Sequence, residues 1–122
     1  MKIAIIGSRT FLDYELLSDT IKKYLSENNL IIKSVVSGGA KGADTLAEKF
    51  ALENTIEMIV FKPDWKRFGK RAGFMRNTLI IENSDVVFAF WDGKSSGTKD
   101  SIEKAKSLNK KVIITHYENL IV

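Results

Sequence analysis

The chain has 122 residues, of which 44% are hydrophobic and 28% charged, and its formal net charge is +4. This composition predicts one soluble globular domain over residues 1–122, with a core that needs no disulfide or metal for stability. The absence of cysteine excludes thiolate metal sites and thiol catalysis, and no apolar run is long enough to span a membrane. We therefore expect a cytoplasmic protein without metal or cofactor, whose positive charge suits anionic partners.

Apolar runs alternate with helical patterns along the chain. Strands are predicted at residues 3–6, 35–36, 56–61, 86–91 and 112–115. Apolar residues at three- and four-residue spacing predict four helices between the strands. The apolar residues of the first helix are Leu17, Ile21, Tyr24 and Leu25, and those of the second are Ala43, Leu46, Ala47, Phe50 and Ala51. Those of the third are Ala72, Met75, Leu79 and Ile80, and in the fourth Ile102, Ala105 and Leu108 are expected to face inward. Asp13 is the expected N-cap of the first helix. Residues 62–71 are expected to be irregular, and residues 117–122 to form a short strand or packed extension.

Strands that are apolar throughout and alternate with helices predict a parallel sheet covered on both faces. The expected fold is a Rossmann-like three-layer α/β/α sandwich with a mostly parallel sheet of five or more strands. In such sheets, ligands bind beyond the carboxyl ends of the strands. The loops that follow the strands are therefore the place to look for a site.

The loop at residues 37–44 is the most informative, and it reads Ser-Gly-Gly-Ala-Lys-Gly-Ala-Asp. Glycines let the backbone approach an anion, and the following helix offers free N–H groups and the positive end of its dipole. Asp44 suits that first helical turn and is also a candidate acceptor for a ribose hydroxyl. The loop matches neither the P-loop nor the dinucleotide fingerprint, so it predicts a phosphorylated ligand without naming one. A glycine turn that serves only close packing is the alternative.

The loops after the first and fourth strands are expected at the same edge of the sheet. Gly7 precedes Ser8, a candidate hydrogen-bond donor, and Arg9, a candidate bidentate ligand of phosphate or carboxylate. The alternative is a tight turn with a solvated arginine. Residues 92–98 are rich in glycine and hydroxyl groups and begin a helix, where Thr98 either caps the helix or helps to form a second phosphate nest.

The segment at residues 62–76 carries six basic residues and one acidic residue, Asp64. Trp65 and Phe68 lie among them, an arrangement in which a base stacks on an aromatic ring while phosphate meets cations. A solvated loop whose aromatic side chains pack into the core is an equally good interpretation.

Four segments carry a family resemblance: residues 7–9, residues 37–44, Lys70-x-Ala72-Gly73-x-x-Arg76-Asn77, and residues 85–98 with Trp91-Asp92-Gly93-x-Ser95-x-Gly97-Thr98. Together they resemble the SLOG superfamily, which unites SMF/DprA-like and LOG-like Rossmannoid domains, and in particular its small branch related to YspA and YpsA. The resemblance covers nearly the whole chain. It implies a domain that binds nucleotides or nucleotide-derived molecules, with Arg76 and Asn77 facing the pocket that the glycine-rich loops line.

Residue chemistry and resemblance together give the predicted ligand-binding set. It comprises Gly7, Ser8, Arg9, Ser37, Gly38, Gly39, Lys41, Gly42, Asp44, Trp65, Lys70, Arg76, Asn77, Asp92, Gly93, Ser96, Gly97 and Thr98.

One departure from the LOG-like pattern bears on catalysis. The resemblance implies Gly-Gly-x-Gly-Thr-x-x-Glu in LOG-type hydrolases, whereas this chain has Ser101 in place of the glutamate. A hydroxyl cannot replace a carboxylate at an oxocarbenium-like transition state. Asp100 is displaced by about 100° around the helix and is expected to point elsewhere. The remaining catalytic candidates are Asp44, Asp92 and Arg76.

Three functions remain open. The first is binding of a nucleotide-derived ligand, such as an ADP-ribose-type or cyclic nucleotide signal, which the protein senses or sequesters without turnover. The family's link to antiviral signalling suggests a sponge, as a phage protein would be. The second is phosphoribohydrolase-like cleavage of an N-glycosidic bond, and the third is single-stranded DNA binding as in DprA-like relatives. We also expect a homodimer or higher homo-oligomer, for which an apolar helix face or residues 120–122 are candidate surfaces.

Overall fold

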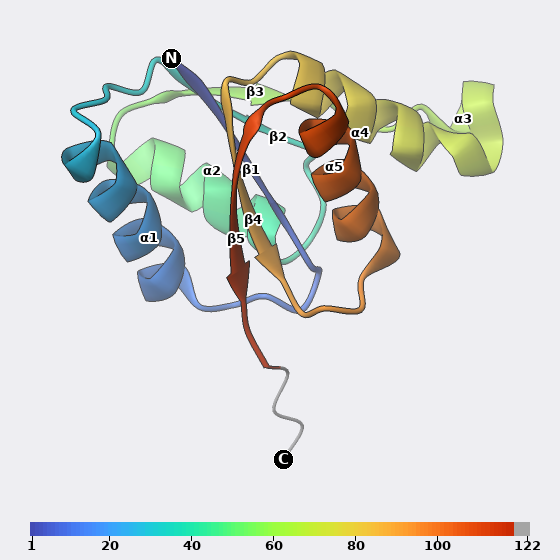
Figure 1. Cartoon of the computed structure of the whole chain (residues 1–122). Helices are drawn as coiled ribbons and strands as arrows, with labels where there is room; N and C mark the ends of the chain where they lie inside the picture. The colour runs from blue at the N-terminus through green and yellow to red at the C-terminus, as the bar shows by residue number, and fades with distance from the viewer. Residues whose placement is uncertain (119–122) are drawn as a thin grey trace.

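The computed structural model describes residues 1–118, which form an α/β fold around one all-parallel sheet (Figure 1). The strand order is β3-β2-β1-β4-β5. The central strand, β1, pairs with β2 through Ile3 and Val35 and with β4 through Ile3 and Val86. The strands are β1 (Lys2–Gly7), β2 (Ser34–Ser37), β3 (Glu57–Val60), β4 (Val86–Trp91) and β5 (Lys111–His116). The predicted parallel Rossmann-like sheet is confirmed, with each strand within two residues of its expected bounds.

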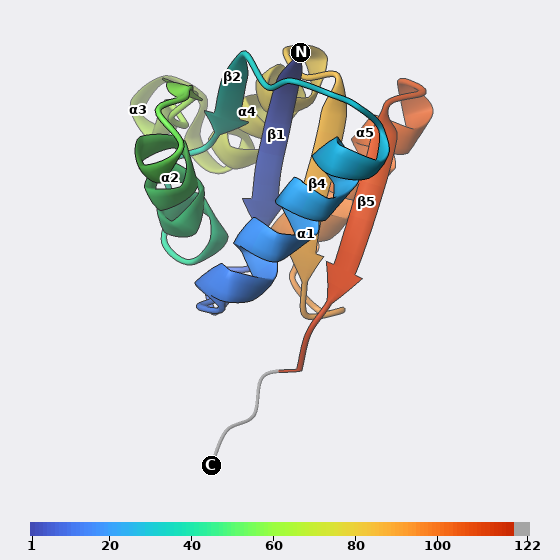
Figure 2. The same ribbon diagram turned by 90° about the vertical axis from the view of Figure 1, so that its left-hand side faces the viewer.

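Helices cover both faces of the sheet. The helices α1 (Tyr14–Glu27) and α2 (Ala43–Glu53) lie on one face, and α4 (Ala72–Glu82) and α5 (Ser96–Ser107) lie on the other (Figures 1 and 2). One apolar cluster joins the first pair to the sheet through Leu17, Ile21 and Phe50. A second joins the other pair through Ile80, Ile81 and Ile102. The predicted apolar positions are therefore buried at Ala72 and Ile80 of α4, but Met75 and Leu79, predicted on the same stripe, are 40% and 44% exposed.

Helix ends follow the expected chemistry in one case and differ in another. The carboxylate of Asp13 accepts a hydrogen bond from the Leu16 amide at 3.1 Å, so the predicted N-cap is confirmed. The N-cap of α5 is Ser95, and Thr98 lies inside the helix, so the capping role expected for Thr98 is wrong. Leu108 was expected to face inward, but it follows the last residue of α5 and is 46% exposed.

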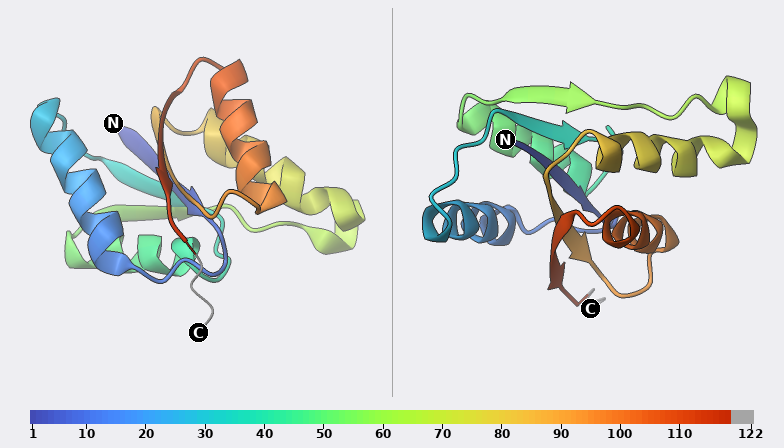
Figure 3. Two further views of the ribbon diagram at one scale, coloured as in Figure 1. Left: turned by 60° about the horizontal axis from the view of Figure 1, so that its bottom comes forward. Right: turned by 45° about the horizontal axis from the view of Figure 1, so that its top comes forward.

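The stretch at residues 62–71 is not irregular as predicted. It contains a short helix, α3 (Trp65–Phe68), and a turn of 3₁₀ helix, η1 (Gly69–Arg71). Asp64 begins this segment, because its carboxylate accepts a hydrogen bond from the Arg67 amide at 3.1 Å. The segment projects from the body beyond the start of α4 (Figures 1 and 3). The proposed tail surface at residues 120–122 lies outside the described residues.

The strand order locates the ligand edge. From β1 the chain proceeds outward through β2 and β3, and then crosses to β4 and β5 on the other side of β1. The switch in direction lies between β1 and β4, where connections diverge and leave a crevice at the carboxyl ends. Among the helices within residues 1–118, none combines the length and apolarity that crossing a bilayer requires.

Candidate functional site

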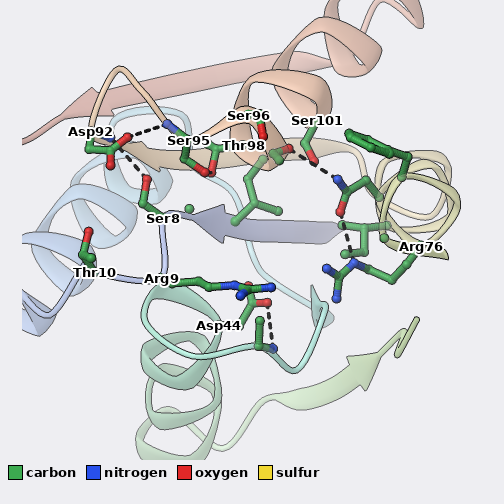
Figure 4. A pocket seen from close by; sticks show the side chains of 18 of the residues that line it. Ser8, Arg9, Thr10, Asp44, Arg76, Asp92, Ser95, Ser96, Thr98 and Ser101 are labelled. Carbon is green, nitrogen blue, oxygen red and sulfur yellow. Dashed lines mark hydrogen bonds between the residues drawn. The ribbon is translucent and has the colours of Figure 1, made fainter. Parts of the chain in front are cut away.

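A cavity of about 510 Å³ opens at the carboxyl ends of β1 and β4 (Figure 4). The loops after β1, β2 and β4 contribute to it, together with α3, α4 and the first turn of α5. Twelve of the predicted residues line it: Gly7, Ser8, Arg9, Asp44, Trp65, Lys70, Arg76, Asn77, Asp92, Ser96, Gly97 and Thr98. Segments far apart in sequence therefore meet at the edge that the strand pattern indicates.

Six predicted residues do not line the cavity: Ser37, Gly38, Gly39, Lys41, Gly42 and Gly93. The glycines of the 37–44 loop instead allow close contacts with protein. A Cβ at Gly42, whose φ is +76°, would stand 2.4 Å from the carbonyl oxygen of Arg9. The carbonyl of Gly38 accepts a hydrogen bond from the Arg76 guanidinium at 2.7 Å. Gly42 and Gly38 do not line the cavity themselves, but they contact Arg9 and Arg76, which do.

Asp44 and Ala40 are the residues of this loop that line the cavity, and Asp44 is the one with a charged side chain. It is only 8% exposed, and its Oδ2 accepts a hydrogen bond from the Ala40 amide at 3.0 Å. Burial raises the pKa of Asp44 above its usual value, while the Ala40 amide and the positive charge of Arg76 act in the opposite direction. The buried Ser37 hydroxyl also lowers the pKa of Asp44 by its proximity, although its geometry is not that of a hydrogen bond.

Two arginines face the same space. Nη1 of Arg76 binds the Gly38 carbonyl, and its Nε donates to Oδ1 of Asn77 at 3.1 Å, so the guanidinium is held on two sides. Burial lowers the pKa of Arg76, Asp44 raises it, and the nearby positive charge of Arg9 lowers it. Arg9 itself is exposed. The charge of Arg9 disfavours the charged form of Arg76, and an anion bound near both arginines would offset this repulsion.

The first turn of α5 forms the opposite wall, and the loop before it is fixed by Asp92. The Asp92 carboxylate accepts a hydrogen bond from the Ser95 amide at 2.8 Å (Figure 4) and another from the Lys94 amide at 2.9 Å. These two amides lower the pKa of Asp92. The Asp92 amide in turn donates to the Ser8 hydroxyl at 3.3 Å. Asp92 therefore orients the N-terminus of α5 toward the cavity, where free N–H groups favour negative charge.

Asn77 connects α4 to α5. Its Nδ2 donates to the Gly97 carbonyl and to the Asp100 carboxylate, each at 3.3 Å. Asp100 also forms a 2.9 Å ion pair with Lys104 and does not line the cavity, in agreement with the expected direction of its side chain. Ser101 is buried and does line it.

An aromatic rim forms the end of the cavity near α3. Trp65 is 54% exposed and Phe74 is 48% exposed, and both line the cavity together with Lys70. A Cβ at Gly73 would stand 3.3 Å from the Trp65 ring, so glycine lets the indole lie against the start of α4. Phe68, the other predicted stacking residue, does not line the cavity.

Eight lining residues were not predicted: Ile6, Thr10, Ala40, Gly73, Phe74, Ile80, Ser95 and Ser101. Each stands beside or one helical turn from a predicted residue, so a wider window around the motifs would have found them. No cluster of three histidine, cysteine or acidic side chains suited to a metal occurs within residues 1–118.

Solved structures with this fold include proteins that act on DNA. DNA processing protein A of Helicobacter pylori, described with its mode of single-stranded DNA binding, matches 93% of the chain with a TM-score of 0.68 and 26% identity. DNA processing protein A of Streptococcus pneumoniae matches 93% with a TM-score of 0.71 and 22% identity. The chain spans 64% and 49% of the lengths of these two proteins. TM1055, a structural genomics target, matches 91% with a TM-score of 0.64 and 21% identity.

Sequence comparison gives a narrower result. The Gene 61 protein of Mycobacterium phage D29 is 32% identical over 118 residues, which cover 92% of this chain and 94% of that protein. The model of the YspA, cpYpsA-related SLOG family matches residues 1–68. That match contains the loops at residues 7–9 and 37–44, which supply Arg9 and Asp44 to the cavity. The chain therefore belongs to the YspA, cpYpsA-related SLOG family.

Proposed function

We propose that the chain is a single nucleotide-binding domain that senses or sequesters a nucleotide or nucleotide-derived ligand without turnover. One observation carries the proposal: Arg9, Arg76 and the N-terminus of α5 converge on one cavity that the aromatic side chains of Trp65 and Phe74 also line. Within residues 1–118, neither arginine forms a salt bridge. Cations without a carboxylate partner in a cavity are suited to an anionic ligand.

The cationic and aromatic groups that line the cavity suit the phosphate and the base of a nucleotide. Phosphate oxygens would be bound by the arginines and the amides of the first turn of α5. The base would stack at the rim on Trp65 or Phe74, with Lys70 nearby. A volume of about 510 Å³ lies within the range of small-molecule sites. A relative encoded by a phage is in keeping with a protein that sequesters a host nucleotide signal.

Binding is favoured over N-glycosidic cleavage by the state of the carboxylates. Glycoside hydrolases use two carboxyl groups, one as acid and one as base or nucleophile, and cleavage of an N-glycosidic bond passes through a similar oxocarbenium-like transition state. Asp92 accepts two amide hydrogen bonds that lower its pKa, which suits a structural role and not proton donation. Ser101 lines the cavity where the resemblance to LOG-type hydrolases implies a glutamate. Asp44 remains as a lone buried carboxyl group.

A ligand screen by thermal shift and calorimetry tests the proposal. A nucleotide at a hundred times its Kd stabilises the folded state by about 2.7 kcal/mol, a shift of several degrees for a chain of this size. Arg9→Ala is expected to weaken binding at least ten-fold, because a charge-assisted contact is lost. The matched control is Arg67→Ala, an exposed arginine that does not line the cavity. Failure of nucleoside mono-, di- and triphosphates, ADP-ribose and cyclic nucleotides to bind would overturn the proposal.

Chromatography of the same mixtures separates binding from catalysis. Intact nucleotide after long incubation is expected. Release of free base that is abolished by Asp44→Asn would establish the hydrolase alternative.

Single-stranded DNA binding is a second candidate function, favoured by one specific observation. The projecting α3–η1 segment carries Lys66, Arg67, Lys70 and Arg71 beside the half-exposed Trp65. The similar Helicobacter pylori protein is described with a single-stranded DNA binding mode. Fluorescence anisotropy with a labelled oligonucleotide tests this candidate, and Lys66→Ala with Arg67→Ala is expected to weaken binding without affecting the cavity.

A further inference from the structure

The buried carboxylate of Asp44 has fewer partners than its burial requires. The side chain is 92% removed from solvent and lines the cavity, and the Ala40 amide is its one hydrogen-bond donor of good geometry within residues 1–118. No salt bridge joins it to Arg76, although the guanidinium is near enough to affect its titration. A buried carboxylate accepts several hydrogen bonds when it is satisfied, and an unsatisfied one is costly. The cavity is where its further donors would come from.

The surroundings of Asp44 restrict what those donors are. A cationic ligand group would be repelled by Arg76, and Arg76 in turn interacts with Arg9. A neutral hydroxyl donates to a carboxylate without adding positive charge. Any nucleotide carries its sugar next to its phosphate, and Asp44 lies next to an arginine of the proposed phosphate subsite. Asp44 is therefore placed where the sugar hydroxyls of such a ligand would lie.

We propose that Asp44 accepts hydrogen bonds from the ribose hydroxyls of the bound nucleotide and makes the site select ribonucleotides over 2′-deoxyribonucleotides. This inference rests on the proposed function and extends it to recognition of the sugar of the nucleotide. The selection has a physical cause: a 2′-deoxy sugar would leave a buried carboxylate oxygen without its donor, whereas a lost contact at an exposed site is replaced by water. It also implies that any binding of DNA uses a surface other than this cavity.

The experiment compares matched pairs of ligands by calorimetry, with AMP, GMP and CMP against dAMP, dGMP and dCMP. The wild-type protein is expected to bind the ribonucleotide of at least one pair ten-fold or more tightly. Asp44→Asn keeps an oxygen for the Ala40 amide and is expected to fold. It should weaken ribonucleotide binding and reduce the preference to about two-fold or less, because one carboxylate oxygen is replaced by a donor.

The matched control is Glu48→Gln. Glu48 is exposed, lies one turn further along α2 and does not line the cavity, so this change removes the same charge from the same helix. It is expected to leave the preference unchanged. Equal affinity for ribo- and deoxyribonucleotides, or a preference that survives Asp44→Asn, would overturn the inference and leave the proposed function standing. If neither class of nucleotide binds, the proposed function fails and the inference with it.

Discussion

At the scale of single residues, Asp44 costs the protein stability, and the cost depends on pH. Because burial raises its pKa in the folded state, the folded protein holds this proton more tightly than the unfolded chain does. Stability therefore falls as the pH rises from the ordinary pKa of a carboxyl group through the raised pKa of Asp44. We predict that Asp44→Asn is about 0.5–2 kcal/mol more stable than wild type at pH 7.

Urea denaturation at pH 7 and at about pH 3, below the ordinary pKa of an aspartate, measures this difference. The advantage of the variant should shrink as the pH falls, because the wild-type carboxyl group is then protonated in both states. Lower stability of Asp44→Asn at pH 7 would mean that the Ala40 amide and Arg76 compensate the carboxylate for its burial.

The glycines of the 37–44 loop give a second prediction at this scale. Gly42→Ala forces a side chain into a positive-φ conformation and places its Cβ 2.4 Å from a backbone oxygen that cannot rotate away. We expect a loss of about 3 kcal/mol or more in unfolding free energy. Gly97→Ala is the control, since it meets no atom within 4 Å and lies in a helix, where alanine is preferred. Equal stability of the two variants would contradict this reading of the loop.

At the scale of elements, the short helix α3 has an N-cap residue next to a residue that lines the cavity. Asp64 accepts the Arg67 amide and is the N-cap of the four residues that include Trp65. We predict that Asp64→Ala speeds amide exchange across residues 65–71 and weakens nucleotide binding several-fold, because Trp65 lines the cavity. Global stability should change by less than about 1 kcal/mol. Hydrogen exchange followed by mass spectrometry measures the first effect, and unchanged exchange would show that packing holds α3 without its cap.

The elements that the sequence predicted well are those that bury a regular stripe. The five strands are apolar runs, and α1 and α2 repeat their apolar residues at helical spacing. The errors fall where several residues offer the same local chemistry. Ser95 and Thr98 both carry capping hydroxyls, and spacing alone does not choose between them. Residues 62–71 contain too few apolar positions to show a helical period, although Asp64 is a typical N-cap residue and so indicates the start of a helix.

At the scale of the whole molecule, the site followed from topology, because all parallel strands send their next loop to one edge. The partners of individual groups did not follow. That Gly38 binds Arg76, and that Asp44 is buried without an ion pair to any of residues 1–118, depends on how α4 packs against the loop after β2. The packing of this helix against the loop joins residues 38 positions apart, a separation over which sequence periodicity carries no information.

The chain has a net charge of +4, and positive side chains gather at two surfaces, the cavity and the α3–η1 segment. The dependence of binding on salt concentration distinguishes the two surfaces. A mononucleotide in the cavity makes one cluster of phosphate contacts, so its affinity should fall only weakly with salt. A single-stranded oligonucleotide on the α3–η1 segment would release about 0.7 counterion per phosphate contacted.

Lys66→Ala with Arg67→Ala is expected to reduce the slope of log affinity against log salt by about 1.4 for the oligonucleotide. The same variant should leave the mononucleotide affinity unchanged, because neither residue lines the cavity. If Arg9→Ala and the double variant weaken both ligands equally, the two surfaces form one continuous nucleic-acid site, and the conclusion that DNA binds outside the cavity would be wrong.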